Sequence, residues 1–193
     1  MRALAAAFAL LAAPLLAAPA SANPYEGLCS PKPWGLTGEQ PICFAGRVVD
    51  VLCELSGDCP ADCGGGTRQI GLVSEPDGRL MIAGKNGQPV FSGAVHDLAP
   101  YCQQRVLVEG QSVGGEDVAP GAPRMLMIQR VRPIGGDWAK ANRFTKAWAE
   151  KHPDAGGKGP WFRRDPLIGA EIEADGYLGL GPEADRAFIK DWY

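Results

Sequence analysis

Alternating apolar and polar positions divide the middle of the chain into five segments that are typical of β-strands. The first, ICFAGRVVDVLCEL at 42–55, is long for a strand, and Gly46 within it indicates a bend or a bulge. The sequence EPDG at 75–78 predicts a tight turn between the second and third segments. The four further strands are expected at 67–74, 79–84, 105–113 and 124–134.

A short helix is predicted between the third and fourth strands. HDLAPYCQQ at 96–104 carries Asp97 as a candidate cap and Pro100 in the first turn. Three strands, a helix and two strands over 42–134 resemble the OB-fold, a small five-stranded Greek-key barrel. The resemblance is one of topology and carries no motif of a named family. It implies a mainly β fold, with another small β-barrel or an α+β sandwich as the alternatives.

The remaining residues, 135–193, form a predicted C-terminal extension of helices and irregular chain. Apolar residues recur at three- and four-residue spacing in 137–152, which predicts a helix capped by Asp137. Residues 153–181 are expected to be a linker followed by irregular structure, and 182–193 a closing helix. The extension is too short for a large core of its own. It is therefore expected to pack on the barrel or to dock onto a partner.

The first 22 residues have the form of a secretory signal peptide. Arg2 precedes an apolar run from Ala3 to Ala18, and ASA at 20–22 has the small-x-small pattern of a signal peptidase site. The run is too short to predict a permanent membrane-spanning helix. Cleavage at this site leaves a chain that begins with a segment rich in proline and glycine at 23–41. We therefore expect a periplasmic or secreted protein that does not insert into a membrane after cleavage.

Charge excludes two classes of partner. The chain has 19 Lys and Arg against 22 Asp and Glu, a net charge of −3. This balance gives no electrostatic attraction for nucleic acid or for an anionic membrane surface. The predicted strands also carry few aromatic side chains on which bases could stack. We expect no nucleic-acid function despite the resemblance to the OB-fold.

All the cysteines lie beyond the predicted signal peptide, and their number is even. An even count in an exported chain favours disulfides over free thiols. Cys43 and Cys53 lie on one predicted strand, about 30 Å apart at ~3.3 Å per residue, which is too far for a bond. Cys29 is therefore the expected partner of Cys43. The six candidates for disulfide bonds are Cys29, Cys43, Cys53, Cys59, Cys63 and Cys102.

The other four cysteines allow three pairings. In a strand meander, the loop after the first strand and the segment after the third lie at the same end of the barrel. This places Cys102 near the loop that spans Cys53–Cys63. We expect Cys102 to bond one loop cysteine and the other two to close the loop.

A metal site is the alternative use of the same sulfurs. Cys53, Cys59, Cys63 and Cys102, with His96, could supply ligands to copper or zinc. The loop spacing, C-x5-C-x3-C, is not a common zinc-finger spacing. The sequence has no C-x-x-C pair and no C-x-x-C-H, which argues against a thioredoxin-like enzyme and a c-type cytochrome.

A calcium loop is a further candidate in the extension. Glu171, Glu173 and Asp175 match the first, third and fifth positions of an EF-hand loop, and Gly176 matches the sixth. The twelfth position is Pro182 rather than an acid, so the match is partial. The alternative is an acidic segment that leads into a capped helix.

The sequence predicts no catalytic site. His96 beside Asp97 could act as a general base, but no serine or cysteine nucleophile in a recognisable motif accompanies it. Aromatic and arginine side chains near the C-terminus indicate a docking surface instead, formed by Trp161, Phe162, Arg163, Arg164, Trp192 and Tyr193. We predict a non-enzymatic, disulfide-stapled accessory module without a resident cofactor, which docks to a periplasmic partner such as a redox enzyme. Copper or zinc handling by the cysteine loop is the alternative function.

Overall fold

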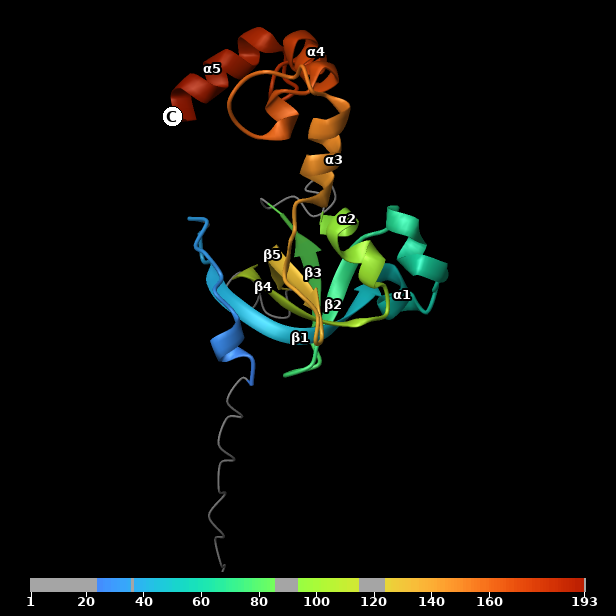
Figure 1. The fold of residues 1–193 in the computed structure, drawn as a ribbon. Coiled ribbons are helices and arrows are strands. Elements are labelled where there is room, and N and C mark those ends of the chain that lie inside the picture. Colours follow the sequence, from blue (N-terminus) through green and yellow to red (C-terminus); the bar gives the residue numbers. More distant parts are fainter. Residues whose placement is uncertain (1–23, 36, 86–93, 115–123, 193) are drawn as a thin grey trace, which may run out of the picture.

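The computed structural model describes residues 24–35, 37–85, 94–114 and 124–192, so the predicted signal peptide at 1–22 and Tyr193 lie outside the described residues. A five-stranded barrel carries a helical lobe, which Figure 1 shows projecting from one end of the barrel. The strands of the barrel are β1 (Gln40–Asp50), β2 (Ile70–Ser74), β3 (Leu80–Gly84), β4 (Arg105–Val113) and β5 (Met125–Pro133).

The barrel closes around β1, which is long enough to pair with two strands. Its first part runs antiparallel to β4 and its second part antiparallel to β2. The two registers overlap at Gly46, where a Cβ atom would lie 2.7 Å from the carbonyl oxygen of Val73, so only glycine permits the approach. β3 and β5 run parallel and complete the cylinder. The order β1-β2-β3-β5-β4 confirms the predicted OB-like Greek-key barrel.

The core lies inside the barrel and is closed at one end by α2 (Ala94–Leu98). This helix contacts β2, β3 and β5, and its Leu98 is fully buried. The predicted helix between the third and fourth strands is thus present, followed by η3 (Ala99–Tyr101). Each fully buried large apolar side chain stabilises the fold by roughly 1.5–3 kcal/mol. The largest fully buried members of the core cluster are Ile70, Leu72, Leu98, Leu126 and Ile128.

The first strand ends earlier than predicted, because Asp50 starts a helix. Its carboxylate accepts hydrogen bonds from the backbone N–H groups of Leu52 (2.9 Å) and Cys53 (3.2 Å), which is a side-chain N-cap. The predicted strand 42–55 therefore continues as α1 (Val51–Ser56). A second short helix, η2 (Ala61–Gly66), completes the connection to β2.

The amino-terminal segment covers the outer face of β4. It contains η1 (Glu26–Leu28) and is bonded to β1 through Cys29 and Cys43. The backbone N–H of Ser30 donates to Glu109 (2.8 Å), and the Gln111 amide donates to the carbonyl of Lys32 (2.8 Å). Both β4 side chains are almost fully buried, so the segment serves as a polar cover for the barrel.

The helical lobe follows a two-residue strand, β6 (Ala139–Lys140), which pairs with β5. This pairing explains why the first helix of the lobe, α3 (Arg143–Lys151), begins later than predicted: residues near Asp137 belong to the sheet connection and do not cap it. The lobe then contains η4 (Trp161–Arg163), α4 (Pro166–Asp175) and α5 (Pro182–Trp192).

The helix α4 lies where the sequence predicted irregular chain. Asp165 caps it, accepting hydrogen bonds from the N–H groups of Leu167 (3.0 Å) and Ile168 (3.3 Å). Pro166 occupies the first helical position, where a missing N–H costs nothing. Within the described part of the chain, no helix has the length and apolar character needed to cross a membrane.

Candidate functional site

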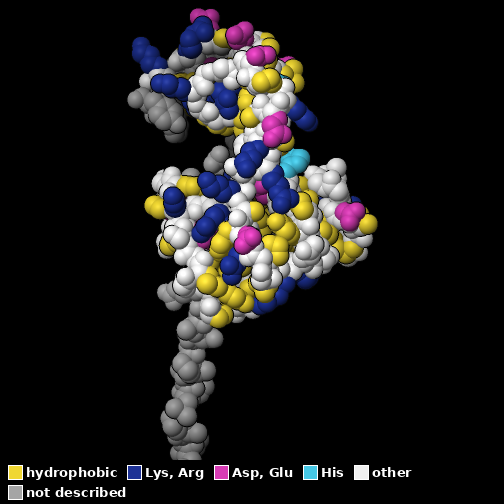
Figure 2. Space-filling model, in the orientation of Figure 1, with side chains coloured by type: hydrophobic (Ala, Val, Ile, Leu, Met, Phe, Trp, Pro, Cys, Tyr) yellow, Lys and Arg dark blue, Asp and Glu magenta, His cyan; other side chains and the backbone are white. Residues whose placement is uncertain are grey.

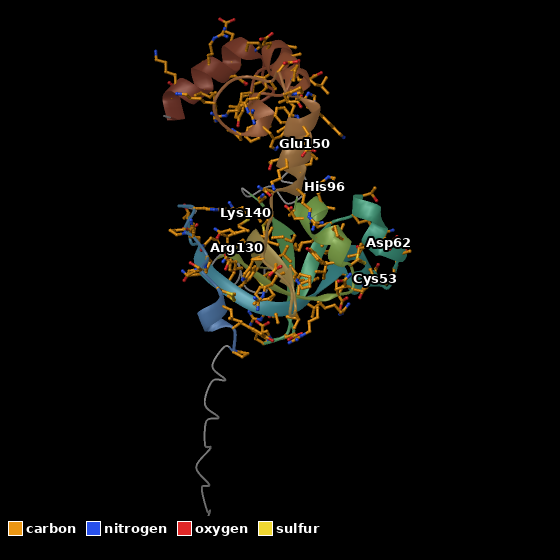
Figure 3. The ribbon with its side chains drawn as sticks, in the orientation of Figure 1. Cys53, Asp62, His96, Arg130, Lys140 and Glu150 are labelled. Atoms are coloured by element: carbon orange, nitrogen blue, oxygen red, sulfur yellow. A yellow bond between two sulfur atoms is a disulfide. The ribbon has the colours of Figure 1, made fainter. Side chains whose placement is uncertain are left out.

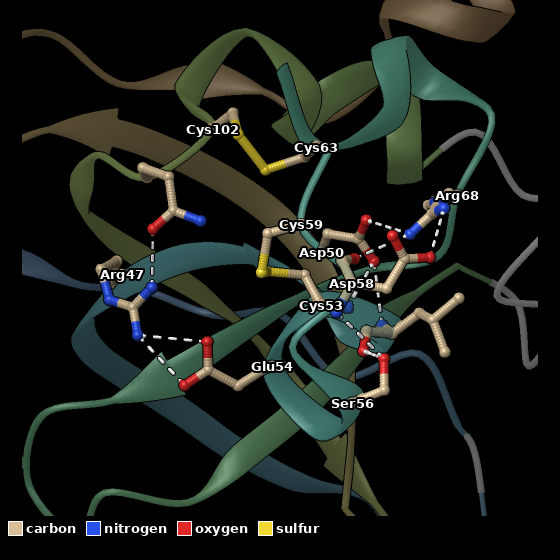
Figure 4. The surroundings of a disulfide bond; sticks show 12 residues. Arg47, Asp50, Cys53, Glu54, Ser56, Asp58, Cys59, Cys63, Arg68 and Cys102 are labelled. Atoms are coloured by element: carbon tan, nitrogen blue, oxygen red, sulfur yellow. Dashed lines mark hydrogen bonds and ion pairs between the residues drawn. A yellow bond between two sulfur atoms is a disulfide. The ribbon is translucent and has the colours of Figure 1, made fainter. Parts of the chain in front are cut away.

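The six cysteines form three disulfides in the structure. Cys29 bonds Cys43, as expected. Figure 4 shows the other two disulfides, in which Cys63 bonds Cys102 and Cys53 bonds Cys59. This is one of the three pairings that the sequence left open. All six sulfurs are bonded, so none of them presents a thiolate to a metal ion in this state.

The glycines that follow Cys63 form a left-handed turn. Five successive residues, from Asp62 to Gly66, have positive φ angles between 50° and 88°. Non-glycine residues adopt this conformation at a cost of about 1–2 kcal/mol each, so Asp62 and Cys63 are held there by their surroundings. Cys63 is almost completely buried and covalently tied to Cys102. The disulfide therefore fixes the turn, and the glycines permit it.

Arg68 ties the remaining part of the loop to the barrel. Its guanidinium contacts Asp50 (3.3 Å) and Asp58 (2.9 Å), as Figure 4 shows. A pocket of about 530 Å³ opens beside the disulfides, where Arg47 is already paired with Glu54 (3.1 Å) and hydrogen-bonded to Gln103 (2.7 Å). The Arg47–Glu54 pair thus neutralises two of the charged groups that line this pocket, while Asp62 lies on the same lining.

Asp97 joins the barrel to the lobe. It was predicted to cap its own helix, but its carboxylate accepts the backbone N–H of Arg143 (2.8 Å) and so caps α3. The neighbouring His96 packs its ring against Phe144, 5.2 Å between centroids, and points toward α3 rather than toward the cysteine loop (Figure 3). Of the five proposed metal ligands, the structure thus brings the four cysteines together as disulfides and places His96 elsewhere.

The buried carboxyl of Asp97 has a raised pKa. Burial is the main cause, opposed by the Arg143 N–H and by the charges of Lys85 and Arg143. One of its oxygens, Oδ2, has no hydrogen-bond partner among the described residues. Folding therefore makes ionisation of Asp97 less favourable than it is in the unfolded chain, because a raised folded pKa means that folding increases proton affinity.

We expect Asp97→Asn to be at least as stable as the wild type at pH 7, because the amide oxygen keeps the cap on α3 without a buried charge. Asp97→Ala, which removes the cap, should lose about 1 kcal/mol. Folding of the wild type gains stability as the pH falls through the raised folded pKa, so the advantage of Asp97→Asn should shrink on acidification. Urea unfolding at pH 7 and at pH 5 checks this, and an advantage that grows at pH 5 contradicts it.

Three of the six predicted docking residues pack against other side chains of the lobe. Trp161 lies 4.8 Å from Phe144 and 5.9 Å from Trp148 between ring centroids. Phe162 contacts Trp161 edge-on at 6.1 Å, and Arg164 lies 5.0 Å above the ring of Trp148. These residues hold the lobe together, and their direct part in docking stays a prediction. Arg163 is exposed, while the side chain of Trp192 and the whole of Tyr193 lie outside the described residues.

A hydrogen bond fixes the centre of this aromatic cluster. The indole N–H of Trp148 donates to Asp165 (2.6 Å), the same carboxylate that caps α4. This bond is the largest cause of a lowered pKa at Asp165, followed in the same direction by the capped backbone N–H groups. One carboxylate thereby joins α3 to α4.

Large apolar side chains are exposed on a different part of the lobe. Their exposed fractions range from 37% for Ile189 to 71% for Leu167. Three of them lie in the short connection GYLGLG at 176–181, where apolar residues alternate with glycines and cannot join a regular core. This surface was not predicted from the sequence. The apolar residues between glycines at 176–181 could have indicated exposed apolar side chains. We call the six side chains the apolar lobe surface: Leu167, Tyr177, Leu178, Leu180, Phe188 and Ile189.

Asp185 holds the connection that presents this surface. Its buried carboxylate accepts hydrogen bonds from the backbone N–H groups of Leu178 (2.5 Å) and Leu180 (3.1 Å). Gly176 has a φ of +83°, and a Cβ there would lie 2.3 Å from Oδ2 of Asp185. The connection is therefore a defined turn between α4 and α5.

The predicted calcium residues do not form an EF-hand loop. Glu171, Glu173 and Asp175 are exposed and belong to the helix α4, whereas an EF-hand requires them in a loop around the ion. Asp165 and Pro166 start this helix, which the sequence interpretation did not foresee. Across the described residues, no group of three His, Cys, Asp or Glu side chains is arranged to hold a metal ion.

Comparison with models of known protein families finds no match, and comparisons with curated proteins and with solved structures find none either. Fold and surfaces define the class of protein: a disulfide-stapled, OB-like barrel with an appended helical lobe.

Proposed function

We propose that this protein is a non-enzymatic accessory module of the periplasm, whose helical lobe docks to a partner protein. The observation that supports this most is the concentration of exposed apolar side chains on the lobe. Exposed apolar side chains that gather into one patch are a mark of interaction sites. The aromatic cluster beneath them holds the lobe in one shape, which lowers the entropy lost on binding.

The compartment follows from the cysteines. Three disulfides are typical of an oxidising environment outside the cytoplasm. The signal-like sequence at 1–22 supports export through a signal peptide. It is rich in alanine and leucine, as bacterial export signals are, and this favours the periplasm.

Replacing Leu178 and Leu180 together with serine should weaken partner binding about 30-fold or more, since two exposed anchors contribute roughly 1–2 kcal/mol each at a buried interface. Both side chains are exposed, so thermal unfolding of the free protein should change little. The measurement is quantitative affinity capture from a periplasmic extract, followed by titration of the captured partner against each variant.

A matched control exists on the barrel. Leu52 and Leu55 of α1 are exposed by 50% and 73%, and their double serine variant removes a similar apolar area. The proposal requires that this control keep the partner. Equal losses in both variants, or an unchanged partner profile for the lobe variant, would refute lobe docking.

Copper or zinc handling is the alternative. It needs Cys53, Cys59, Cys63 and Cys102 as thiolates, hence reduction of two disulfides. Stoichiometric copper or zinc in protein isolated from the periplasm, together with free thiols, would favour this function over docking.

A further inference from the structure

Positive charge is concentrated in the segment that links the barrel to the lobe. Residues 124–151 contain seven Lys and Arg against two acids, a net charge of +5 on a chain whose net charge is −3. The segment comprises β5, β6 and α3. Figure 2 shows Lys and Arg side chains gathered on this face of the barrel and along the base of the lobe. The acidic overall charge thus conceals a local basic surface.

The strand register brings the basic side chains together. Arg130 and Lys140 are direct cross-strand partners on β5 and β6, and Figure 3 shows them side by side. Arg132 follows on the same face of β5, and the ring of Trp138 lies 4.7 Å from the Arg130 guanidinium and 5.2 Å from that of Arg132. We call Arg130, Arg132, Trp138 and Lys140 the basic ribbon. Like charges directly opposite each other destabilise a sheet, so Arg130 and Lys140 are an unfavourable pair unless a counter-charge lies close by.

Only one of the three cations is neutralised within the barrel. Arg130 donates to the buried carboxylate of Glu109 through Nε (2.5 Å) and Nη2 (2.9 Å), which fixes its guanidinium. Arg132 and Lys140 have no carboxylate within 4 Å in the described part of the chain. The Nε of Arg132 is also buried without a hydrogen-bond partner. Two cationic groups therefore remain to bind an anion, beside one that is held in position.

We propose that the basic ribbon binds an acidic polypeptide segment in an extended conformation. The two free cations, Arg132 and Lys140, are diagonal neighbours across β5 and β6, about 7–8 Å apart, which is close to the ~6.6 Å repeat of alternate side chains in an extended peptide. Planar guanidinium groups bind carboxylates through paired hydrogen bonds, and Trp138 offers an apolar surface between them. A lipid surface has no such repeat, and the apolar side chain within the ribbon is stacked on the arginines rather than projecting.

This surface belongs to β5 and β6, away from the apolar lobe surface, so it is independent of lobe docking. The test uses a fluorescein-labelled peptide of alternating Glu and Thr and the same peptide with Gln in place of Glu. Fluorescence anisotropy measures their dissociation constants at low and at physiological salt. The wild type should bind the acidic peptide alone, and salt should weaken the binding because exposed charges are screened.

Arg132→Gln combined with Lys140→Gln should weaken binding of the acidic peptide by about tenfold, since two ion pairs at an exposed interface are lost. Neither side chain has an ion-pair partner in the described chain, so urea unfolding should be nearly unchanged. The matched control is Arg79→Gln with Lys158→Gln, which removes two exposed basic groups elsewhere and should change affinity by less than about twofold. Arg132→Lys keeps the charge and should give an intermediate affinity.

Equal weakening by the test and control variants would show that net charge alone drives binding and would overturn the proposal. So would a wild type that sediments with phosphatidylglycerol vesicles while failing to bind the peptide, because the ribbon would then be a lipid site. Binding of the Gln peptide with the same affinity as the Glu peptide also refutes it.

Discussion

Replacing Cys63 and Cys102 with alanine is expected to lower the free energy of unfolding by about 4 kcal/mol. The disulfide closes a separation of 39 residues, and in the chain-entropy model the loss scales with the logarithm of that length. Cys63 also lies buried in a left-handed turn that the bond holds, so its removal releases the loop. Urea unfolding of the double variant against the wild type measures the difference.

The matched control is the double alanine variant of Cys53 and Cys59. That bond spans a separation of only 6 residues, so its removal should lower the free energy of unfolding by about 2 kcal/mol. A larger loss for this pair than for Cys63 and Cys102 would contradict the loop-length argument. Thiol titration in denaturant should detect no free thiol before reduction in the wild type.

Replacing Asp185 with alanine should unfold the lobe locally while the barrel persists. The variant loses two hydrogen bonds from backbone N–H groups to a buried carboxylate, at about 1.5–3 kcal/mol each. The lobe has its own small set of packing contacts and joins the barrel mainly through α2 and α3, so its opening does not require the barrel to open. Hydrogen exchange should show lost protection over 166–192 and unchanged protection in β1 and β4.

Glu183→Ala is the matched control, because Glu183 is an exposed acid in the first turn of the same helix. It should leave hydrogen exchange in the lobe nearly unchanged. A uniform loss of protection across barrel and lobe in Asp185→Ala would show that the two parts unfold together, against the expected local opening.

Alternation of apolar residues was enough to predict the barrel strands, because each strand has one face in the core. The strand predicted at 105–113 coincides with β4. The errors arose where a polar side chain starts a helix. Asp50 ends β1 by capping α1, and Asp165 with Pro166 starts α4 in a segment whose composition indicated irregular chain. Both capping signals are local and were present in the sequence.

Contacts between distant segments were harder to predict. The late start of α3 depends on pairing of Ala139 and Lys140 with β5, and its cap comes from Asp97 on another helix. The even cysteine count favoured disulfides, and strand geometry excluded Cys43 with Cys53, but the pairing of the other four cysteines stayed open among three possibilities. The basic ribbon depends on register between β5 and β6, which no residue count can reveal.

The three disulfides join neighbouring cysteines in chain order: the first to the second, the third to the fourth and the fifth to the sixth. Consider a polypeptide that enters an oxidising compartment amino terminus first. The second, fourth and sixth cysteines each emerge when the preceding cysteine, their native partner, is the one still unpaired. Oxidation in that order yields the native connectivity without rearrangement of an earlier disulfide. Cys63 is the exception in timing, because it stays reduced until Cys102 emerges, which makes it the thiol most open to capture by the oxidising enzyme.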